Sequence, residues 1–272
     1  MDLRGRNAIV TGASSGIGAA TAVALARAGA ASVTVVARRP DELEVTRAAC
    51  AAAGADAFAH PADVSDRSAC EGVIAAATAR AGTVDVLVNN AGVSLHAPAA
   101  DATVEQIQWV MGINFFGAVY LTMAVLPGMV QQRRGSIVNV TSLAGYIPNP
   151  NESAYGASKA ALSLWTHGLA VDLHGTGVHA GVVSPGPIDT EIWEKDPVPS
   201  IYEGRKYPPQ IVADAIVTLI RRDGVHVTIP RVYGLVPALY PILQRQLRWG
   251  LLRFRDAGMK KLEKRGLTRG GG

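Results

Sequence analysis

The chain has 272 residues, of which 49% are hydrophobic and 18% are charged. This composition excludes a disordered chain, and the length suits one well-filled α/β domain without requiring a second. The net charge is +4, but residues 1–200 carry 12 Lys/Arg against 17 Asp/Glu, whereas residues 201–272 carry 14 against 5. The basic character therefore belongs to the C-terminal part of the chain.

Membrane spans, export signals and metal sites are not expected. No uninterrupted apolar run reaches the roughly 18–20 residues that a span requires. The first apolar segment, residues 8–10, leads directly into a glycine-rich turn and is no export signal. Cys50 and Cys70 are the only cysteines, and two isolated thiols without a nearby His pair do not make a metal site. We therefore expect no metal and a cytoplasmic location.

Short apolar strands alternate with helices along the chain. The strands are predicted at residues 7–10, 32–36, 57–60, 84–88, 136–141, 178–183 and 225–229. The helices are predicted from the glycine turn to about residue 29 and at residues 41–53, 66–80, 104–132, 152–174 and 209–221. This rhythm predicts a single doubly wound Rossmann-type domain over residues 1–230, with a central parallel sheet of about seven strands and helices on both faces. Residues 231–272 form a C-terminal extension.

A glycine-rich turn follows the first predicted strand. It reads Thr11-Gly12-Ala13-Ser14-Ser15-Gly16-Ile17-Gly18, and a helix begins at once. Glycine permits the tight turn and lets the backbone approach a pyrophosphate, while the helix N-terminus offers free N–H groups. Such turns also occur for purely structural reasons, but the position between the first strand and first helix favours a dinucleotide site.

The G-x-x-x-G-x-G spacing resembles that of the short-chain dehydrogenase/reductase family. Further motifs follow in the family's order: Asn89-Asn90-Ala91-Gly92, Asn114, Ser142, Tyr155-x-x-x-Lys159 and Pro185-Gly186. The resemblance covers roughly residues 5–230. It implies an oxidoreductase that moves a hydride between a nicotinamide cofactor and a small carbonyl or alcohol substrate, with Asn114, Ser142, Tyr155 and Lys159 as catalytic residues.

The chemistry of these four residues suits hydride transfer. Tyr155 and Lys159 lie four apart on a predicted helix and so share a face. A free tyrosine, with a pKa near ~10, is a poor base at neutral pH, and we expect the ammonium of Lys159 to lower that pKa. Ser142 can donate a hydrogen bond to the substrate oxygen. The resemblance implies that Asn114 interrupts its helix and holds a water linking Lys159 to solvent, and that Lys159 binds the nicotinamide ribose.

The end of the second strand indicates which cofactor is used. Ala37 stands where NAD-selective folds place an acidic residue, and Arg38 and Arg39 follow it. Guanidinium groups favour a 2′-phosphate, to which Ser14 adds a hydroxyl, although both arginines could instead be solvated loop residues. We therefore expect NADP rather than NAD.

Other cofactor contacts are implied by the resemblance. Asp63 is expected to hold the adenine amine. The full expected set is Gly12, Ser14, Ser15, Gly16, Ile17, Gly18, Arg38, Arg39, Asp63, Val64, Asn90, Ala91, Gly92, Tyr155, Lys159, Pro185, Gly186, Ile188 and Thr190.

A flap and a tail complete the chain. Residues 191–208 resemble the family's substrate flap. Its apolar and aromatic residues predict either an apolar substrate or packing onto the body; they are Ile192, Trp193, Ile201, Tyr202 and Tyr207.

In the tail, six apolar residues recur at helical spacing with arginines between them: Leu239, Ile242, Leu243, Leu247, Leu251 and Phe254. This helix either packs on the body or on a partner subunit, makes peripheral membrane contact through residues 235–265, or binds another partner. Nucleic acid is not expected, because no reading motif accompanies the basic residues.

Two other functions compete with the oxidoreductase. The first is a non-catalytic NADP-binding sensor or scaffold, and the second is an isomerase or dehydratase on the same fold. Family members often pair through their two long helices, so the resemblance also implies a homodimer or homotetramer.

Overall fold

Seven parallel strands form one continuous sheet. The computed structural model describes residues 1–193 and 200–264. The strands are ordered β3-β2-β1-β4-β5-β6-β7, as expected for a doubly wound sheet. Their bounds are β1 (Asn7–Thr11), β2 (Ser32–Ala37), β3 (Asp56–Pro61), β4 (Val86–Asn89), β5 (Gly135–Val140), β6 (Val178–Pro185) and β7 (His226–Ile229). The predicted Rossmann-type architecture is confirmed.

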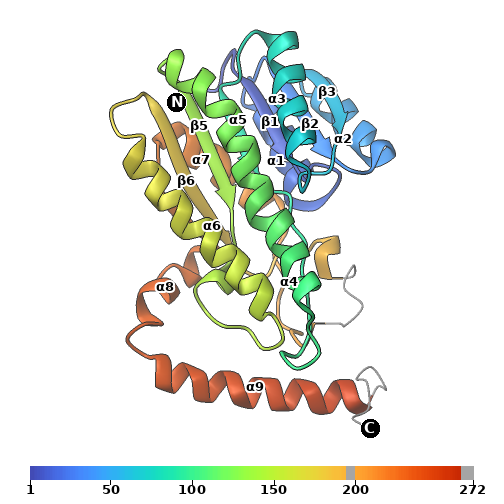
Figure 1. The fold of residues 1–272 in the computed structure, drawn as a ribbon, viewed down its shortest axis with the longest axis vertical. Helices are drawn as coiled ribbons and strands as arrows, with labels where there is room; N and C mark the ends of the chain where they lie inside the picture. Colours follow the sequence, from blue (N-terminus) through green and yellow to red (C-terminus); the bar gives the residue numbers. More distant parts are fainter. Residues whose placement is uncertain (194–199, 265–272) are drawn as a thin grey trace.

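Helices cover both faces of this sheet (Figure 1). One layer consists of α1 (Gly16–Arg27), α2 (Pro40–Ala52) and α7 (Gln210–Arg222). The other consists of α3 (Arg67–Ala81), α4 (Val104–Met111), α5 (Gly117–Gln131) and α6 (Ser153–Asp172). Successive strand residues point to opposite faces, so Ala8 and Val10 pack into the first layer's core and Ile9 into the second's.

A buried polar network ties the central strands to the second layer. The Nδ2 of Asn89 donates to the Oδ1 of Asn139 at 2.8 Å and to Thr122 at 3.1 Å. The Nδ2 of Asn139 donates to Thr166 at 2.7 Å. Since β4, β5, α5 and α6 all contribute to this network, it fixes the strand ends that carry the site.

The segment Val104–Gln131 is long and apolar enough, by length and composition, to cross a membrane. It is not an uninterrupted apolar run, because Gln108 and Asn114 lie within it. In the fold the segment is α4, a five-residue π-helical turn (Gly112–Phe116) and α5, and buried residues such as Leu121 and Met129 pack in the second core. It therefore serves as a core helix of the domain.

The extension forms two helices rather than one. A short helix, α8 (Val236–Leu239), is followed by a turn and by α9 (Gln244–Lys264), which lies beyond the carboxyl end of the sheet (Figure 1). The predicted apolar stripe is thus split: Leu239 belongs to α8, and Ile242 and Leu243 lie in the turn. The remaining members lie on α9.

Truncating a buried α5 residue tests this core. Leu121 is 1% exposed, so Leu121→Ala should lower the free energy of unfolding by about 2–5 kcal/mol, through lost burial and the cavity left behind. Val45→Ala, at a side chain 72% exposed on α2, should change it by less than about 0.5 kcal/mol. Urea denaturation measures both. Equal effects would contradict the assignment of α5 to the core.

Candidate active site

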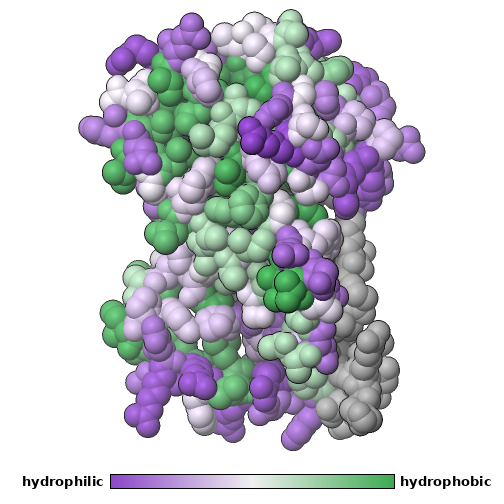
Figure 2. Space-filling model, in the orientation of Figure 1, coloured by the Kyte–Doolittle hydropathy of each residue, from purple (hydrophilic) through white to green (hydrophobic). Residues whose placement is uncertain are grey.

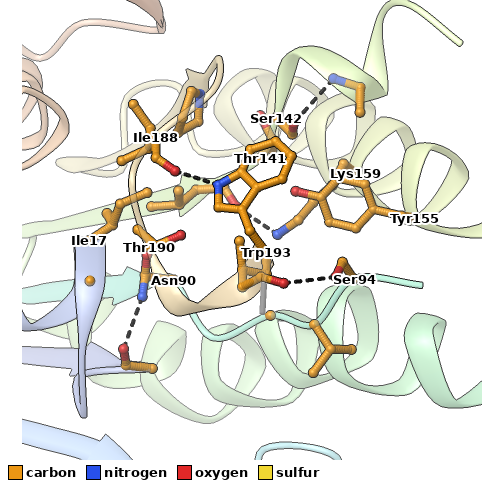
Figure 3. Close-up of a pocket in the computed structure, with 18 of the residues that line it drawn as sticks. Ile17, Asn90, Ser94, Thr141, Ser142, Tyr155, Lys159, Ile188, Thr190 and Trp193 are labelled. Carbon is orange, nitrogen blue, oxygen red and sulfur yellow. Dashed lines mark hydrogen bonds between the residues drawn. The ribbon is translucent and has the colours of Figure 1, made fainter. Parts of the chain in front are cut away.

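The predicted site residues gather around one cavity of about 770 Å³ at the carboxyl ends of the strands. Figure 3 shows how side chains from α1, the segments after β4 and β5, α6 and the segment after β6 converge on it. Every predicted site residue lines this cavity except Gly18 and Asn114. Those two lie behind its wall and shape it through packing.

The glycine turn has the conformation that its glycines permit. Gly12 and Gly16 have φ of +63° and +56°, a region that favours glycine. A Cβ on Gly18 would stand 2.2 Å from the carbonyl oxygen of Gly12, so only glycine lets α1 start this close to β1.

The start of α1 is free of competing groups. Its first turn contains no acidic residue, and the side chain of the N-cap residue Ser15 makes no cap hydrogen bond. The leading N–H groups and the positive end of the helix dipole therefore face the cavity, as a pyrophosphate requires. The residues present thus fit a nicotinamide dinucleotide.

Asn114 sits in the π-helical turn that separates α4 from α5. Its Oδ1 accepts from the backbone N–H of Val93 at 2.8 Å. Its Nδ2 donates to the Val93 carbonyl at 3.0 Å and to the Oγ of Ser158 at 2.9 Å. The predicted interruption of the helix is present, and Asn114 uses it to hold the loop after β4 against α6.

Lys159 is buried at the centre of the site. Its side chain is enclosed, with the residue only 4% exposed, and Nζ donates to the carbonyl of Val140 at 3.1 Å. A Cβ on Gly92 would lie 3.2 Å from this Nζ and 3.2 Å from the Oδ1 of Asn114, so glycine leaves the room that both side chains use. Burial lowers the pKa of Lys159 to about 8.

Tyr155 and Ser142 both line this cavity (Figure 3). Ser142 lies two residues beyond β5, and its Oγ accepts from the backbone N–H of Ala144 at 3.1 Å, which leaves the hydroxyl proton to be donated. Burial raises the pKa of Tyr155 to about 12, opposed by the hydrogen bond from Ser142, and Glu152 raises it further. The expected lowering of the Tyr155 pKa is therefore wrong for the protein alone, because desolvation is the largest influence on it. The Nζ of Lys159 lies 5.9 Å from the ring centroid.

The two arginines after β2 have different environments. Arg39 pairs with Glu42 at 2.8 Å and with Glu191 at 3.2 Å, and donates to the Oγ of Ser14 at 3.2 Å. Arg38 is exposed at the cavity edge and forms no ion pair or hydrogen bond with any residue in the described ranges. Of the two guanidinium groups, only that of Arg39 is held by other described side chains.

The flap contributes aromatic side chains to the cavity, although its residues 194–199 lie outside the described residues. The indole N–H of Trp193 donates to the carbonyl of Ile188 at 2.6 Å, and Tyr202 stacks on Trp193 with centroids 6.0 Å apart. Both rings line the cavity, together with Ile192 and Ile201. Tyr207 instead pairs with the backbone beside Ile188 and packs on the core.

Several residues that line the cavity were not predicted from the sequence. His96 and Glu152 form a buried pair, with Nε2 to Oε1 at 2.9 Å, and both line the cavity near Tyr155. Three further residues that line the cavity belong to the C-terminal extension: Tyr233, Val236 and Phe254. No motif marks any of these residues, since their position depends on how distant segments pack.

The buried lysine predicts a specific pH dependence of stability. Between pH 8 and 10.5 the unfolded chain holds a proton on Lys159 that the folded chain has lost. The free energy of unfolding of the wild type should therefore rise with pH through this window relative to Lys159→Met, by on the order of 3 kcal/mol when complete. Paired urea titrations from pH 7 to 10 measure the difference. A constant difference would mean that Lys159 is not desolvated.

Known proteins match this chain over most of its length. The family model described as short chain dehydrogenase matches residues 6–198. A short chain dehydrogenase of Pseudocercospora fijiensis is 38% identical over 71% of this chain, and the match spans 63% of that relative's length. The ketoacyl reductase HetN of Nostoc sp. is 36% identical over 84% of this chain and 79% of its own.

A solved structure shares the fold as well. It is a short chain dehydrogenase/reductase from Burkholderia phymatum in complex with NAD. The two superpose with a TM-score of 0.83 and 25% identity, over 91% of this chain and 96% of that one.

Proposed function

This chain belongs to the short-chain dehydrogenase/reductase family, and we propose that it is an NADP-dependent carbonyl reductase or alcohol dehydrogenase that uses Tyr155 as its acid/base. One observation carries the proposal: Tyr155, Ser142 and Lys159 line the same cavity as the glycine turn. Acid/base groups and a dinucleotide cradle in one cavity suit hydride transfer to or from a carbon that bears oxygen.

The protein's part in this reaction is to hold the substrate oxygen and move its proton. NADPH, when bound, supplies the hydride that the carbonyl carbon accepts. Tyr155 donates its phenolic proton to the carbonyl oxygen, which becomes the alcohol hydroxyl, and Ser142 stabilises the developing negative charge by donating its O–H to the same oxygen. The high pKa of Tyr155 keeps this proton in place at neutral pH. Alcohol oxidation is the reverse, with Tyr155 accepting the proton.

Arg38 supports the choice of NADP. It is exposed at the edge of the cavity and follows Ala37, whose side chain brings no carboxylate to the ribose. The Oγ of Ser14 adds a polar group next to the same region. Lys159, Asn90 and Thr190 would hold the nicotinamide end.

The substrate, assembly and location extend this proposal. Trp193, Tyr202 and Ile147 give the substrate end an apolar lining that suits an apolar carbonyl compound. Apolar side chains exposed on the π-helical turn, α5 and α6 offer a self-pairing surface for a homodimer or homotetramer, namely Phe116, Met123, Leu164 and Val171. A cytoplasmic location agrees with two buried, unpaired cysteines.

Removing the Tyr155 hydroxyl tests the mechanism. Tyr155→Phe should reduce kcat/KM at least about 100-fold, because the proton donor is lost while the ring's packing is kept. NADPH affinity, measured by fluorescence titration, should change less than about threefold. Preserved turnover would refute the role of Tyr155. A wild type that binds NADPH tightly but turns over no ketone would favour the sensor or scaffold.

Removing the Arg38 guanidinium tests the cofactor. Arg38→Ala should weaken NADP binding about tenfold or more and leave NAD binding nearly unchanged, since only NADP carries the 2′-phosphate. Calorimetric titration with both cofactors measures this. Arg47→Ala, an exposed α2 arginine paired with Glu44, is the control and should alter neither affinity. Equal losses for NAD and NADP would contradict the assignment.

A further inference from the structure

The C-terminal cap, residues 231–264, contributes no acid/base group to the proposed reaction. It comprises a 3₁₀ turn (Arg231–Tyr233), α8 and α9. Figure 1 shows α9 lying across the end of the domain from which the active-site cavity opens, with one side toward the body and the other toward no other element. The two sides of α9 have different chemistry.

The inner face of α9 forms part of the substrate pocket. Leu247, Leu251, Phe254 and Gly258 recur at spacings of three and four, so they share one stripe. Gly258 is buried, and a Cβ there would stand 2.7 Å from the Cβ of Ile201 in the flap. Phe254 lines the cavity and is also 40% exposed, which places its ring at the mouth.

Polar contacts hold this face against the body. Lys261 Nζ lies 2.5 Å from the Oε2 of Glu203, and the Nδ2 of Asn151 contacts the sulfur of Met259 at 3.5 Å. These contacts come from the flap and from the loop before α6. The cap is therefore seated on the two segments that frame the substrate entrance.

The outer face is basic and carries an exposed tryptophan. Arg245, Trp249, Arg253 and Lys260 recur at spacings of four and seven, opposite the inner stripe, and all are exposed. Trp249 is 63% exposed, and the Arg253 guanidinium carbon lies 4.5 Å from its ring centroid. Figure 2 shows hydrophilic and hydrophobic residues side by side along the edge where α9 lies.

Exposed apolar side chains concentrate in the cap. The large ones are Val232, Leu235, Leu239, Ile242, Leu243, Trp249, Leu252 and Phe254. Ile242 is 77% exposed and Leu235 is 70% exposed, so nothing in the described chain covers them. Such surface costs free energy in water and indicates a surface that becomes covered.

The charge of the cap identifies what covers it. Residues 231–272 carry 10 Lys/Arg against 2 Asp/Glu. A second copy that presented the same surface would place like charges against like charges. An anionic bilayer surface attracts the arginines, accepts the apolar side chains, and offers the interface in which tryptophan is favoured.

We propose that the outer face of α9 docks this enzyme on anionic membrane surfaces, so that its substrate is a lipid-dissolved carbonyl compound that enters past Phe254. The substrate part rests on the proposed function. The docking part does not, because membrane binding can be measured without turnover.

Sedimentation with lipid vesicles tests the docking. The full-length chain should sediment with vesicles of phosphatidylcholine and phosphatidylglycerol (7:3), and much less with phosphatidylcholine alone or in high salt. The double variant Trp249→Ala/Arg253→Glu should bind the anionic vesicles at least tenfold more weakly while keeping NADPH affinity. Arg222→Glu, the same charge reversal at an exposed arginine on α7, is the matched control and should bind like the wild type.

Two results would overturn the docking. One is failure of the wild type to sediment, and the other is equal vesicle binding by the double variant and the wild type. A fall in the mass of the protein in light scattering for the double variant, without weaker vesicle binding, would instead assign the face to self-association. Circular dichroism confirms that each variant is folded.

The substrate route has its own readout. With 2-tridecanone embedded in the anionic vesicles, Phe254→Ala should change KM severalfold without altering vesicle binding. The outer-face double variant should lose activity on this embedded ketone but retain it on a water-soluble ketone. Binding to vesicles without any turnover would leave the docking standing and refute the proposed function. Equal loss on both ketones would refute entry from the membrane.

Discussion

The burial of the Lys159 ammonium is the interaction on which the rest of the site depends. An enclosed cation needs a partner, and Nζ has the Val140 carbonyl at the end of β5. The side chain reaches that point because α6 packs beside β5, because Asn114 holds the loop after β4 against α6, and because Gly92 has no Cβ. The end of β5, helix α6 and the loop after β4 are thus all arranged around the Lys159 ammonium.

That arrangement also sets the character of Tyr155. The enclosure that lowers the pKa of Lys159 to about 8 raises that of Tyr155 to about 12. A phenol with so high a pKa keeps its proton and acts as an acid toward a carbonyl oxygen, which suits reduction. For alcohol oxidation the pKa must fall, and the positive charge of an oxidised nicotinamide would act in that direction. The protein alone is therefore poised as a proton donor.

The parallel sheet explains why much of the site could be predicted. The ends of β1, β4, β5 and β6 meet at one edge, so Gly12, Asn90, Ser142 and Pro185 converge once the strand order is fixed. The family resemblance also predicted that the helix is interrupted at Asn114, where the structure has a π-helical turn. The direction of the Tyr155 pKa was not predictable, because desolvation depends on tertiary packing.

The same limit explains what the sequence did not reveal. Glu152 and His96 are 56 residues apart, and no periodic pattern connects them. In the sequence, Phe254 is one of six residues in a single apolar stripe. In the structure, the turn before α9 divides this stripe, and Phe254 lines the cavity. Contacts between segments far apart in the sequence carry no local signature.

The reaction proposed for this cavity is hydride transfer to a carbonyl carbon. The most direct measurement incubates the full-length protein with NADPH deuterated at C4, in both configurations, and a series of ketones of increasing chain length. Mass spectrometry of the products then locates the label. We expect an alcohol that carries deuterium on the carbinol carbon, formed best from the more apolar ketones. Tight NADPH binding with no labelled alcohol from any ketone would contradict it.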